Sequence, residues 1–188
     1  MGLGNPGAQY ERTRHNLGAE TVTLLATRQN QSLRAEKGTR SAVAKVQLGG
    51  KAVVLAIPDT FMNDSGLAVS ALARRFGVEE GSSVVVVHDE LDLPSGRVKV
   101  KAGGGTAGNN GLESINAHLH DDSYLRVRIG IGKPPGRQAG ADYVLRRPGR
   151  TEREVLDAAE EVAADAVETI ATSGVEAAMQ QFNSEPLA

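Results

Sequence analysis

The chain has 188 residues, enough to bury the core of one domain, and its formal net charge of −2 gives no overall reason to expect a nucleic-acid partner. It contains no cysteine, which excludes disulfides, cysteine–zinc sites and thiol nucleophiles. No apolar run approaches the roughly 18 residues that a membrane span requires, and no signal peptide opens the chain. We therefore expect a cytoplasmic protein without a membrane partner.

The first part of the chain predicts a glycine-rich turn, a helix, a β-hairpin and a second helix. The turn is Gly2-Leu3-Gly4-Asn5-Pro6-Gly7, where glycine and proline favour unusual backbone angles. Apolar periodicity and the Gly49-Gly50 turn define the helices and the hairpin, whose first strand should be half exposed and whose second strand should be buried. The expected elements are a helix over 17–28, strands over 41–48 and 51–57, and a helix over about 67–76 that ends at Gly77.

The most informative stretch is the run of four valines at 84–87, which leads directly into His88-Asp89-Glu90. An apolar run without alternation indicates a strand buried on both faces at the centre of an α/β sheet. Ligands bind outside the carboxyl ends of such strands, so a carboxylate at this tip is well placed for chemistry. Because side chains alternate along a strand, His88 and Asp89 should point to opposite faces, and Asp89 needs a partner from elsewhere in the chain.

The rest of the chain continues the alternation of strands and helices. A capping box at Thr151-x-x-Glu154 marks the expected start of a long amphipathic helix that reaches about Thr172. The other expected elements are strands over 97–101 and 124–131, a glycine loop over 103–111 that opens a helix over 112–119, a short helical lid over 141–145, and a last helix after Gly174. This order predicts one α/β domain, residues 1–188, with a mixed, twisted β-sheet flanked by α-helices.

Basic residues concentrate between Arg97 and Arg150, a segment with ten Lys and Arg but four acidic residues. After Thr151 the balance reverses, and Arg153 is the single basic residue. The asymmetry is compatible with a local polyanion-binding face, although solvated charged faces are common. The basic residues of the segment are Arg97, Lys99, Lys101, Arg126, Arg128, Lys133, Arg137, Arg146, Arg147 and Arg150.

Several familiar motifs are disfavoured. Gly2-x-Gly4-x-x-Gly7 matches the dinucleotide fingerprint, but that motif needs a strand before it and a helix opening within it, and a single residue precedes Gly2. The glycine loop lacks the Lys-Ser/Thr ending of a phosphate-binding P-loop. There is no G-x-S-x-G elbow and no H-E-x-x-H or similar spacing, so we expect no serine nucleophile, no metal and no cofactor.

Histidine and amide side chains suggest a different chemistry. Alone, His15 in Thr13-Arg14-His15-Asn16 would be an ordinary surface histidine. A neutral imidazole oriented by a carboxylate can, however, deprotonate water, and Asp89 is a suitable carboxylate. Amide side chains suit hydrogen bonds to a peptide backbone or to a developing oxyanion, and three lie in separate turns: Asn5, Asn63 and Asn110.

Together, these residues resemble the bacterial peptidyl-tRNA hydrolase family, in the family's order and across most of the chain. The matching segments are Gly2–Gly7, Tyr10, Thr13–Asn16, Phe61-Met62-Asn63-x-Ser65-Gly66, His88–Asp92, Gly103–Gly111 and Arg126–Gly132. The resemblance implies a monomeric, metal-free hydrolase that cleaves the ester between peptide and tRNA in peptidyl-tRNA and releases both.

The resemblance also implies roles for individual residues. His15 would be the general base that activates water, and Asp89 would orient it. Substrate-binding residues would be Asn5, which helps to distinguish a peptidyl from a free aminoacyl end, with Tyr10, Phe61, Met62, Asn63 and Asn110. The residues expected to contact tRNA phosphates are Lys99, Lys101 and Arg128.

The sequence departs from the family in two places. The family usually has a longer start, with a strand before Gly2. Its glycine loop usually carries a histidine just before the asparagine and a His or Glu earlier, where this chain has Asn109 and Thr106. Two other functions stay open: an RNA-binding module without catalysis, disfavoured because phosphate contact needs neither His15 nor Asp89, and a nucleotide-cofactor enzyme, disfavoured by the missing strand.

Overall fold

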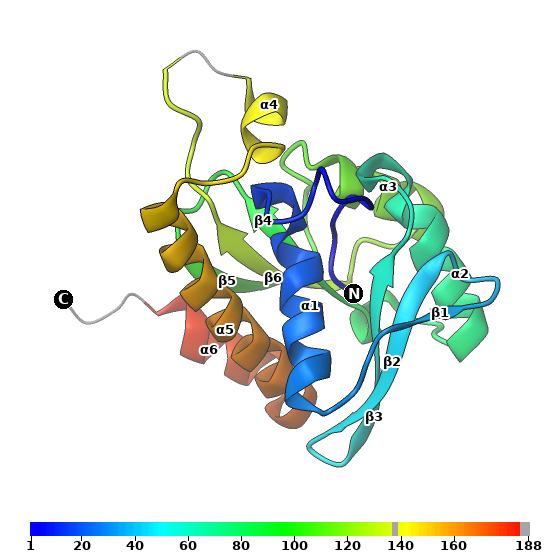
Figure 1. Cartoon of the computed structure of the whole chain (residues 1–188). Helices are drawn as coiled ribbons and strands as arrows, with labels where there is room; N and C mark the ends of the chain where they lie inside the picture. Colours follow the sequence, from blue (N-terminus) through cyan, green and yellow to red (C-terminus); the bar gives the residue numbers. More distant parts are fainter. Residues whose placement is uncertain (137–138, 185–188) are drawn as a thin grey trace.

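The computed structural model describes residues 1–136 and 139–184, so Arg137 of the predicted polyanion face lies outside the described residues. These residues form a single α/β domain, as expected, with helices packed around β-strands (Figure 1). In chain order the elements are η1 (Arg14–Asn16), α1 (Leu17–Arg28), β1 (Arg34–Glu36), β2 (Ser41–Leu48), β3 (Lys51–Pro58), η2 (Met62–Asp64), α2 (Ser65–Phe76), η3 (Gly81–Ser83), β4 (Val85–Glu90), β5 (Val98–Ala102), α3 (Asn110–Leu119), β6 (Leu125–Gly130), α4 (Gly140–Val144), α5 (Arg150–Ser173) and α6 (Val175–Asn183).

The strands form two three-stranded sheets rather than the one mixed sheet expected. The order β1-β2-β3 is antiparallel throughout, whereas in β4-β6-β5 the first pair is parallel and the second antiparallel. The first three residues lie between the two sheets. The Gly2 amide donates to Ala56 O of β3 (2.9 Å), and the Leu3 amide donates to Val87 O of β4 (3.0 Å). This short segment therefore joins two sheets that otherwise do not pair.

The valine strand is buried on both faces, as expected. Val87 belongs to a core shared with α1 and α5, whereas Val86 packs in a second core with residues of η2 and α3. Successive side chains of β4 thus point to opposite faces, as predicted, and the strand separates two layers of helices.

Among the described helices, none is both long and apolar enough to cross a bilayer.

Two local expectations are wrong. In the hairpin, β2 buries five of its eight residues and β3 buries three, because β2 is the central strand of its sheet, with a neighbour on each side. The long helix begins at Arg150 with Gly149 as its N-cap, and no side chain caps it, so Thr151 lies within the first turn and forms no capping box. Gly77 ends α2 in the left-handed conformation (φ 66°), as predicted.

Helix α1 approaches the sheet unusually closely at Gly18. A Cβ built on Gly18 would lie 2.1 Å from Val87 O and 2.7 Å from the Leu3 amide nitrogen, so the helix backbone rests directly on β4 and on the N-terminal segment. The turn η1 comes immediately before this helix. The close approach therefore brings η1 to the carboxyl end of β4.

The outer strand β5 is covered at one edge by the end of α6. The Val100 amide donates to Asn183 Oδ1, and Asn183 Nδ2 donates to Val100 O, both at 2.8 Å. Arg97 adds hydrogen bonds to the carbonyls of Asn183 and Ser184. The C-terminal helix is thereby fixed along β5.

Candidate active site

His15 and Asp89, which are 74 residues apart in sequence, are in direct contact. His15 Nδ1 lies 2.9 Å from Asp89 Oδ1 and 3.0 Å from Asp89 Oδ2. His15 is the middle residue of η1, and Asp89 is the penultimate residue of β4. Both residues are buried, with 9% and 4% of their surface exposed. His88 takes no part in this contact, because its Nδ1 lies 2.7 Å from the carbonyl oxygen of Asp89.

The contact sets the protonation chemistry of His15. Burial alone would lower the pKa of the imidazole, but the charge and the hydrogen bond of Asp89 outweigh it, so the pKa of His15 is raised above its ordinary value. A carboxylate accepts, so Nδ1 carries the hydrogen in the neutral ring, and Nε2 then holds the free lone pair. Among the described residues, Nε2 has no hydrogen-bond partner. His15 is thus arranged to accept a proton at Nε2.

The amide of Asn16 ties η1 to the first loop. Asn16 Nδ2 donates to the backbone carbonyl of Asn5, and the backbone N–H of Asn5 donates to Asn16 Oδ1, both at 2.9 Å. Asn16 is 7% exposed. No role for Asn16 is predicted from the sequence. Its position directly after His15 is the one feature of the sequence that could have indicated a role in the site. The paired bonds fix the backbone on one side of the histidine.

Asn5 also connects the first loop to η2. Its Oδ1 accepts a hydrogen bond from the Met62 amide (2.8 Å), which orients the side chain and leaves Nδ2 as its remaining donor. Met62 itself is 4% exposed and packs in the second core, so its side chain anchors η2 to the interior. A Cβ on Gly111 would lie 2.6 Å from Met62 Sδ, which shows how closely α3 begins beside η2. Asn63 on η2 and Asn110 at the start of α3 are both exposed near this junction.

Tyr10 and Phe61 form an aromatic pair contributed by two different loops. Their ring centroids are 6.2 Å apart at an interplanar angle of 82°, which is an edge-to-face contact. Phe61 is 52% exposed, whereas the next residue, Met62, is buried. An exposed aromatic face suits stacking against a planar ring such as a nucleobase.

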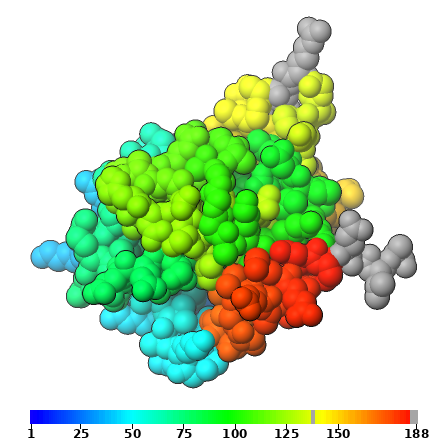
Figure 2. Space-filling model, turned by 180° about the vertical axis from the view of Figure 1, so that it is seen from behind, coloured from blue at the N-terminus to red at the C-terminus, as the bar shows by residue number. Residues whose placement is uncertain are grey.

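The three residues expected to contact tRNA phosphates, Lys99, Lys101 and Arg128, lie on β5 and β6. Lys99 pairs directly with Arg128, and Lys101 with Arg126, so like charges stand opposite each other across the two strands. Such pairs are unfavourable unless an anion or a carboxylate compensates, and Arg128 Nε donates to Glu90 Oε2 (3.1 Å). In the opposite view the green segment around residue 100 lies beside the red helix α6 (Figure 2).

Arg126 is more deeply buried than these three residues. It is 2% exposed, its Nη1 donates to Gly105 O (2.7 Å), and its Nη2 donates to Gly103 O. Burial lowers its pKa. Arg126 thus fixes the glycine loop through two of its carbonyls. The sequence does not reveal this role, because Arg126 and Arg128 look alike in the alternating pattern of the strand.

The two residues by which the glycine loop departs from the family, Asn109 and Thr106, both make local contacts. Asn109 is the N-cap of α3, and its Oδ1 accepts hydrogen bonds from the amides of Gly111 (3.0 Å) and Leu112 (3.1 Å). Thr106 Oγ1 lies 3.5 Å from Glu113 Oε1. The side chain in place of the family's histidine therefore fixes the helix start that carries Asn110.

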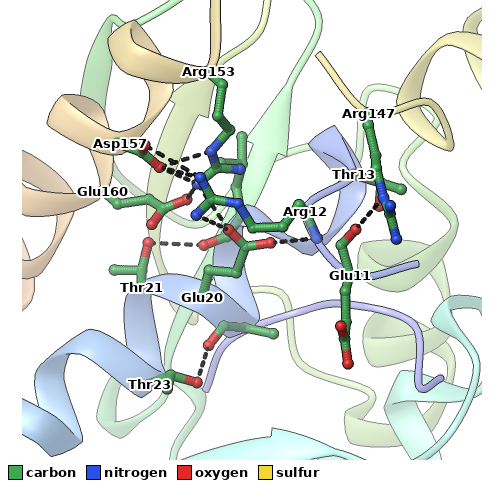
Figure 3. A network of polar contacts seen from close by, with 12 residues as sticks. Glu11, Arg12, Thr13, Glu20, Thr21, Thr23, Arg147, Arg153, Asp157 and Glu160 are labelled. Atoms are coloured by element: carbon green, nitrogen blue, oxygen red, sulfur yellow. Dashed lines mark hydrogen bonds and ion pairs between the residues drawn. The ribbon is translucent and has the colours of Figure 1, made fainter. Parts of the chain in front are cut away.

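An ionic network centred on the buried Arg153 and Glu160 contacts α1 and Arg12 (Figure 3). Arg153 contacts Glu160, Asp157 (2.6 Å) and Glu20 (2.8 Å), and the Arg12 amide donates to Glu20 Oε1 (3.0 Å). Burial raises the pKa of Glu160 to about 8, although the charge of Arg153 opposes the shift. Arg153, the single basic residue after Thr151 in the sequence, thus joins α5 to α1 and to the loop before η1.

No group of three or more His, Asp or Glu side chains within residues 1–136 and 139–184 is placed to hold a metal ion. The arrangement instead offers a buried His–Asp pair, exposed amides, an aromatic pair and nearby cations. Such a set can activate water, hold a carbonyl group and contact both a base and phosphates.

Comparison with known proteins gives consistent matches over nearly the whole chain. A family model described as "Peptidyl-tRNA hydrolase" matches residues 1–188. Peptidyl-tRNA hydrolases of Rhodococcus erythropolis and Nocardia farcinica are 47% and 48% identical over 183 residues, which cover 97% of this chain and 96% and 94% of theirs. The crystal structure of peptidyl-tRNA hydrolase from Acinetobacter baumannii superimposes with a TM-score of 0.92 at 33% identity, covering 100% of this chain and 94% of that one.

Proposed function

The chain belongs to the peptidyl-tRNA hydrolase family, and on that basis we propose that it hydrolyses the ester between peptide and tRNA with His15 as general base and Asp89 as its orienting partner. The observation that carries the residue roles is the buried contact between His15 Nδ1 and Asp89, which leaves Nε2 free. We further propose that the enzyme acts as a monomer, since every group that the mechanism uses comes from one chain, and that it works in the cytoplasm without metal.

The reaction begins with a water molecule hydrogen-bonded to His15 Nε2. As the water oxygen attacks the ester carbonyl carbon, Nε2 takes one proton, and Asp89 stabilises the imidazolium that forms. The carbonyl oxygen becomes an oxyanion, and we assign its hydrogen-bond donors to the side-chain amides of Asn63 and Asn110, which are both exposed. The intermediate collapses, the 3′ oxygen of the tRNA leaves, and the proton on Nε2 passes to that oxygen.

Recognition of the two halves of the substrate falls to different groups. Asn5 Nδ2, the donor left over from the bond to Met62, is available for a peptide carbonyl, which a free aminoacyl end lacks. Tyr10 and Phe61 offer a stacking surface for the terminal base, and Met62 supports it from the core. Lys99, Lys101 and Arg128 offer cations to tRNA phosphates.

The function is tested by incubating the protein with peptidyl-tRNA and excess chelator and following the release of free tRNA. Release that persists in chelator supports metal-free hydrolysis. Binding without release would identify an RNA-binding module, and release that stops in chelator would contradict the proposed mechanism.

Substitution of Lys101 tests the phosphate contacts. Lys101→Ala is expected to weaken tRNA binding and to reduce the salt dependence of binding by about one counterion, because one phosphate contact is lost. Hydrolysis of a minimal ester that lacks most of the tRNA should hardly change. Lys51→Ala, an exposed lysine at the start of β3, is the matched control and should bind normally. Equal losses on both substrates would argue against a phosphate contact.

The pH profile tests the protonation state of the base. The pKa of His15 is raised, so the acid limb of kcat/KM is expected above the ordinary histidine value of about 6.5, with activity rising as the ring deprotonates. The stabilisation of the fold by this pair has the opposite sign: it is complete below about pH 6.5 and is lost as the pH rises through the folded-state pKa. In Asp89→Asn the limb should move to lower pH, because burial then acts alone. A limb that stays in place would remove Asp89 as the cause.

A further inference from the structure

Arg14, the residue directly before His15, is anchored by an unusually complete set of contacts. Its side chain is 8% exposed. Nε and Nη2 donate to the two oxygens of Glu152 at 2.7 and 2.6 Å, and Nη1 donates to the carbonyls of Tyr143 (3.2 Å) and Arg146 (3.1 Å). The guanidinium carbon also lies 4.0 Å from the centroid of the Tyr143 ring. Buried, bidentate and stacked, this arrangement requires an arginine rather than a lysine.

The partners of Arg14 come from separate parts of the C-terminal region. Tyr143 lies in α4, Glu152 lies in the first turn of α5, and Arg146 lies between the two helices. The Tyr143 hydroxyl donates to Ile131 O (2.9 Å), which ties α4 to the residue that follows β6. The Arg14 side chain thereby connects η1 to α4 and α5 and, through Tyr143, to the residue that follows β6.

The same turn carries the proposed base. Because η1 is three residues long, its middle residue cannot keep its orientation if the flanking residues move. Asn16 fixes one flank to the first loop, and Arg14 fixes the other flank to α4 and α5. Asp89 is fixed independently by the pairing of β4 with β6. The distance between His15 and Asp89 therefore depends on how firmly η1 is held.

We propose that Arg14 is a positioning residue that holds η1 so that His15 Nδ1 stays against Asp89, and that it thereby makes the geometry of the base depend on the seating of α4. This inference rests on the proposed role of His15. It assigns Arg14 no contact with substrate, since its donors are directed to Glu152 and to the two carbonyls.

The test compares Arg14→Lys with Arg28→Lys. Arg28 is a matched control because it also joins α1 to carboxylates of α5, through Glu161, Asp165 and Glu168, but at the far end of the helix. Arg14→Lys is expected to lower kcat by about 10- to 100-fold through misplacement of the base, with KM changed by less than about twofold. Its His15 pKa, read from the ring resonances by NMR, should fall back toward the ordinary value as the contact with Asp89 loosens. Arg28→Lys should leave kcat and this pKa unchanged.

Glu152→Gln provides the second variant if Arg14→Lys does not fold. It keeps Arg14 and its bonds to the two carbonyls but removes the carboxylate charge, so kcat and the His15 pKa should shift in the same directions by smaller amounts. Equal losses of kcat in the Arg14 and Arg28 variants, or a His15 pKa unchanged in both Arg14→Lys and Glu152→Gln, would overturn the inference. Wild-type activity in His15→Ala would instead contradict the proposed function. The NMR comparison of the His15 pKa between the wild type and Arg14→Lys would still test whether Arg14 positions His15.

Discussion

Replacing Asp89 with Asn is expected to lower the turnover of peptidyl-tRNA by about two to four orders of magnitude, by analogy with the corresponding change in serine proteases. The amide has nearly the shape of the carboxylate but carries no charge. It can donate to Nδ1, which favours the tautomer with hydrogen on Nε2, and it stabilises the imidazolium poorly. Single-turnover hydrolysis measures the loss.

The same experiment tests whether His15 and Asp89 act as a unit. His15→Ala should cost at least as much as Asp89→Asn, and the double variant should cost little more than the worse single one. Binding of tRNA is the control and should survive, because the cations proposed to contact phosphates lie on β5 and β6. Strictly additive losses would mean that the two residues work independently, and the pairing would have to be abandoned.

Gly18→Ala is expected to have the largest effect on stability, lowering the free energy of unfolding by about 3 kcal/mol, at the upper end of overpacking costs. The methyl group would lie 2.1 Å from Val87 O and 2.7 Å from the Leu3 amide nitrogen, and neither backbone group can move without disturbing the junction of the two sheets. Intrinsic helix propensity predicts the opposite sign, since alanine is favoured over glycine by about 1 kcal/mol. Urea unfolding therefore separates the two effects clearly.

Gly149→Ala is the control for that measurement. Gly149 has a φ of −67°, and nothing lies within 4 Å of a Cβ built there. Its substitution should cost less than about 1 kcal/mol, the modest loss of a glycine N-cap. If Gly18→Ala were as stable as the wild type, α1 would not rest on β4 so closely.

Much of the fold follows from local patterns that the sequence carries. The four valines predict a strand with two buried faces, and Val86 and Val87 do pack into different cores. The division into two sheets could not be predicted, because it depends on the first three residues pairing with strands more than 50 positions away. The capping-box prediction is wrong for a related reason: the motif is present, but the backbone of Gly149 already provides the helix start.

The candidate site shows the same contrast. The chemistry of His15 and Asp89 and the family resemblance predict their pairing, and the structure brings them within hydrogen-bonding distance. Arg14, Arg126 and Arg153 resemble solvated charges in the sequence, yet each is less than a tenth exposed. The partners of Arg14 and Arg126 lie far away along the chain, so no spacing rule reveals them. Arg153 does have a partner at helical spacing, Asp157, but that spacing does not reveal that the guanidinium is buried. Burial of a charge can be recognised only once the tertiary contacts are known.

The hydrogen bonds between Asn183 and Val100 have a consequence for the behaviour of the protein in concentrated solution. Strand β5 is an outer strand, and an outer strand with free amides and carbonyls can recruit a strand from another molecule. The amide group of Asn183 offers one donor and one acceptor, as a neighbouring strand would, and satisfies both groups of Val100. A single side chain thus occupies the middle of this edge, at Val100, where a strand from another molecule would otherwise pair.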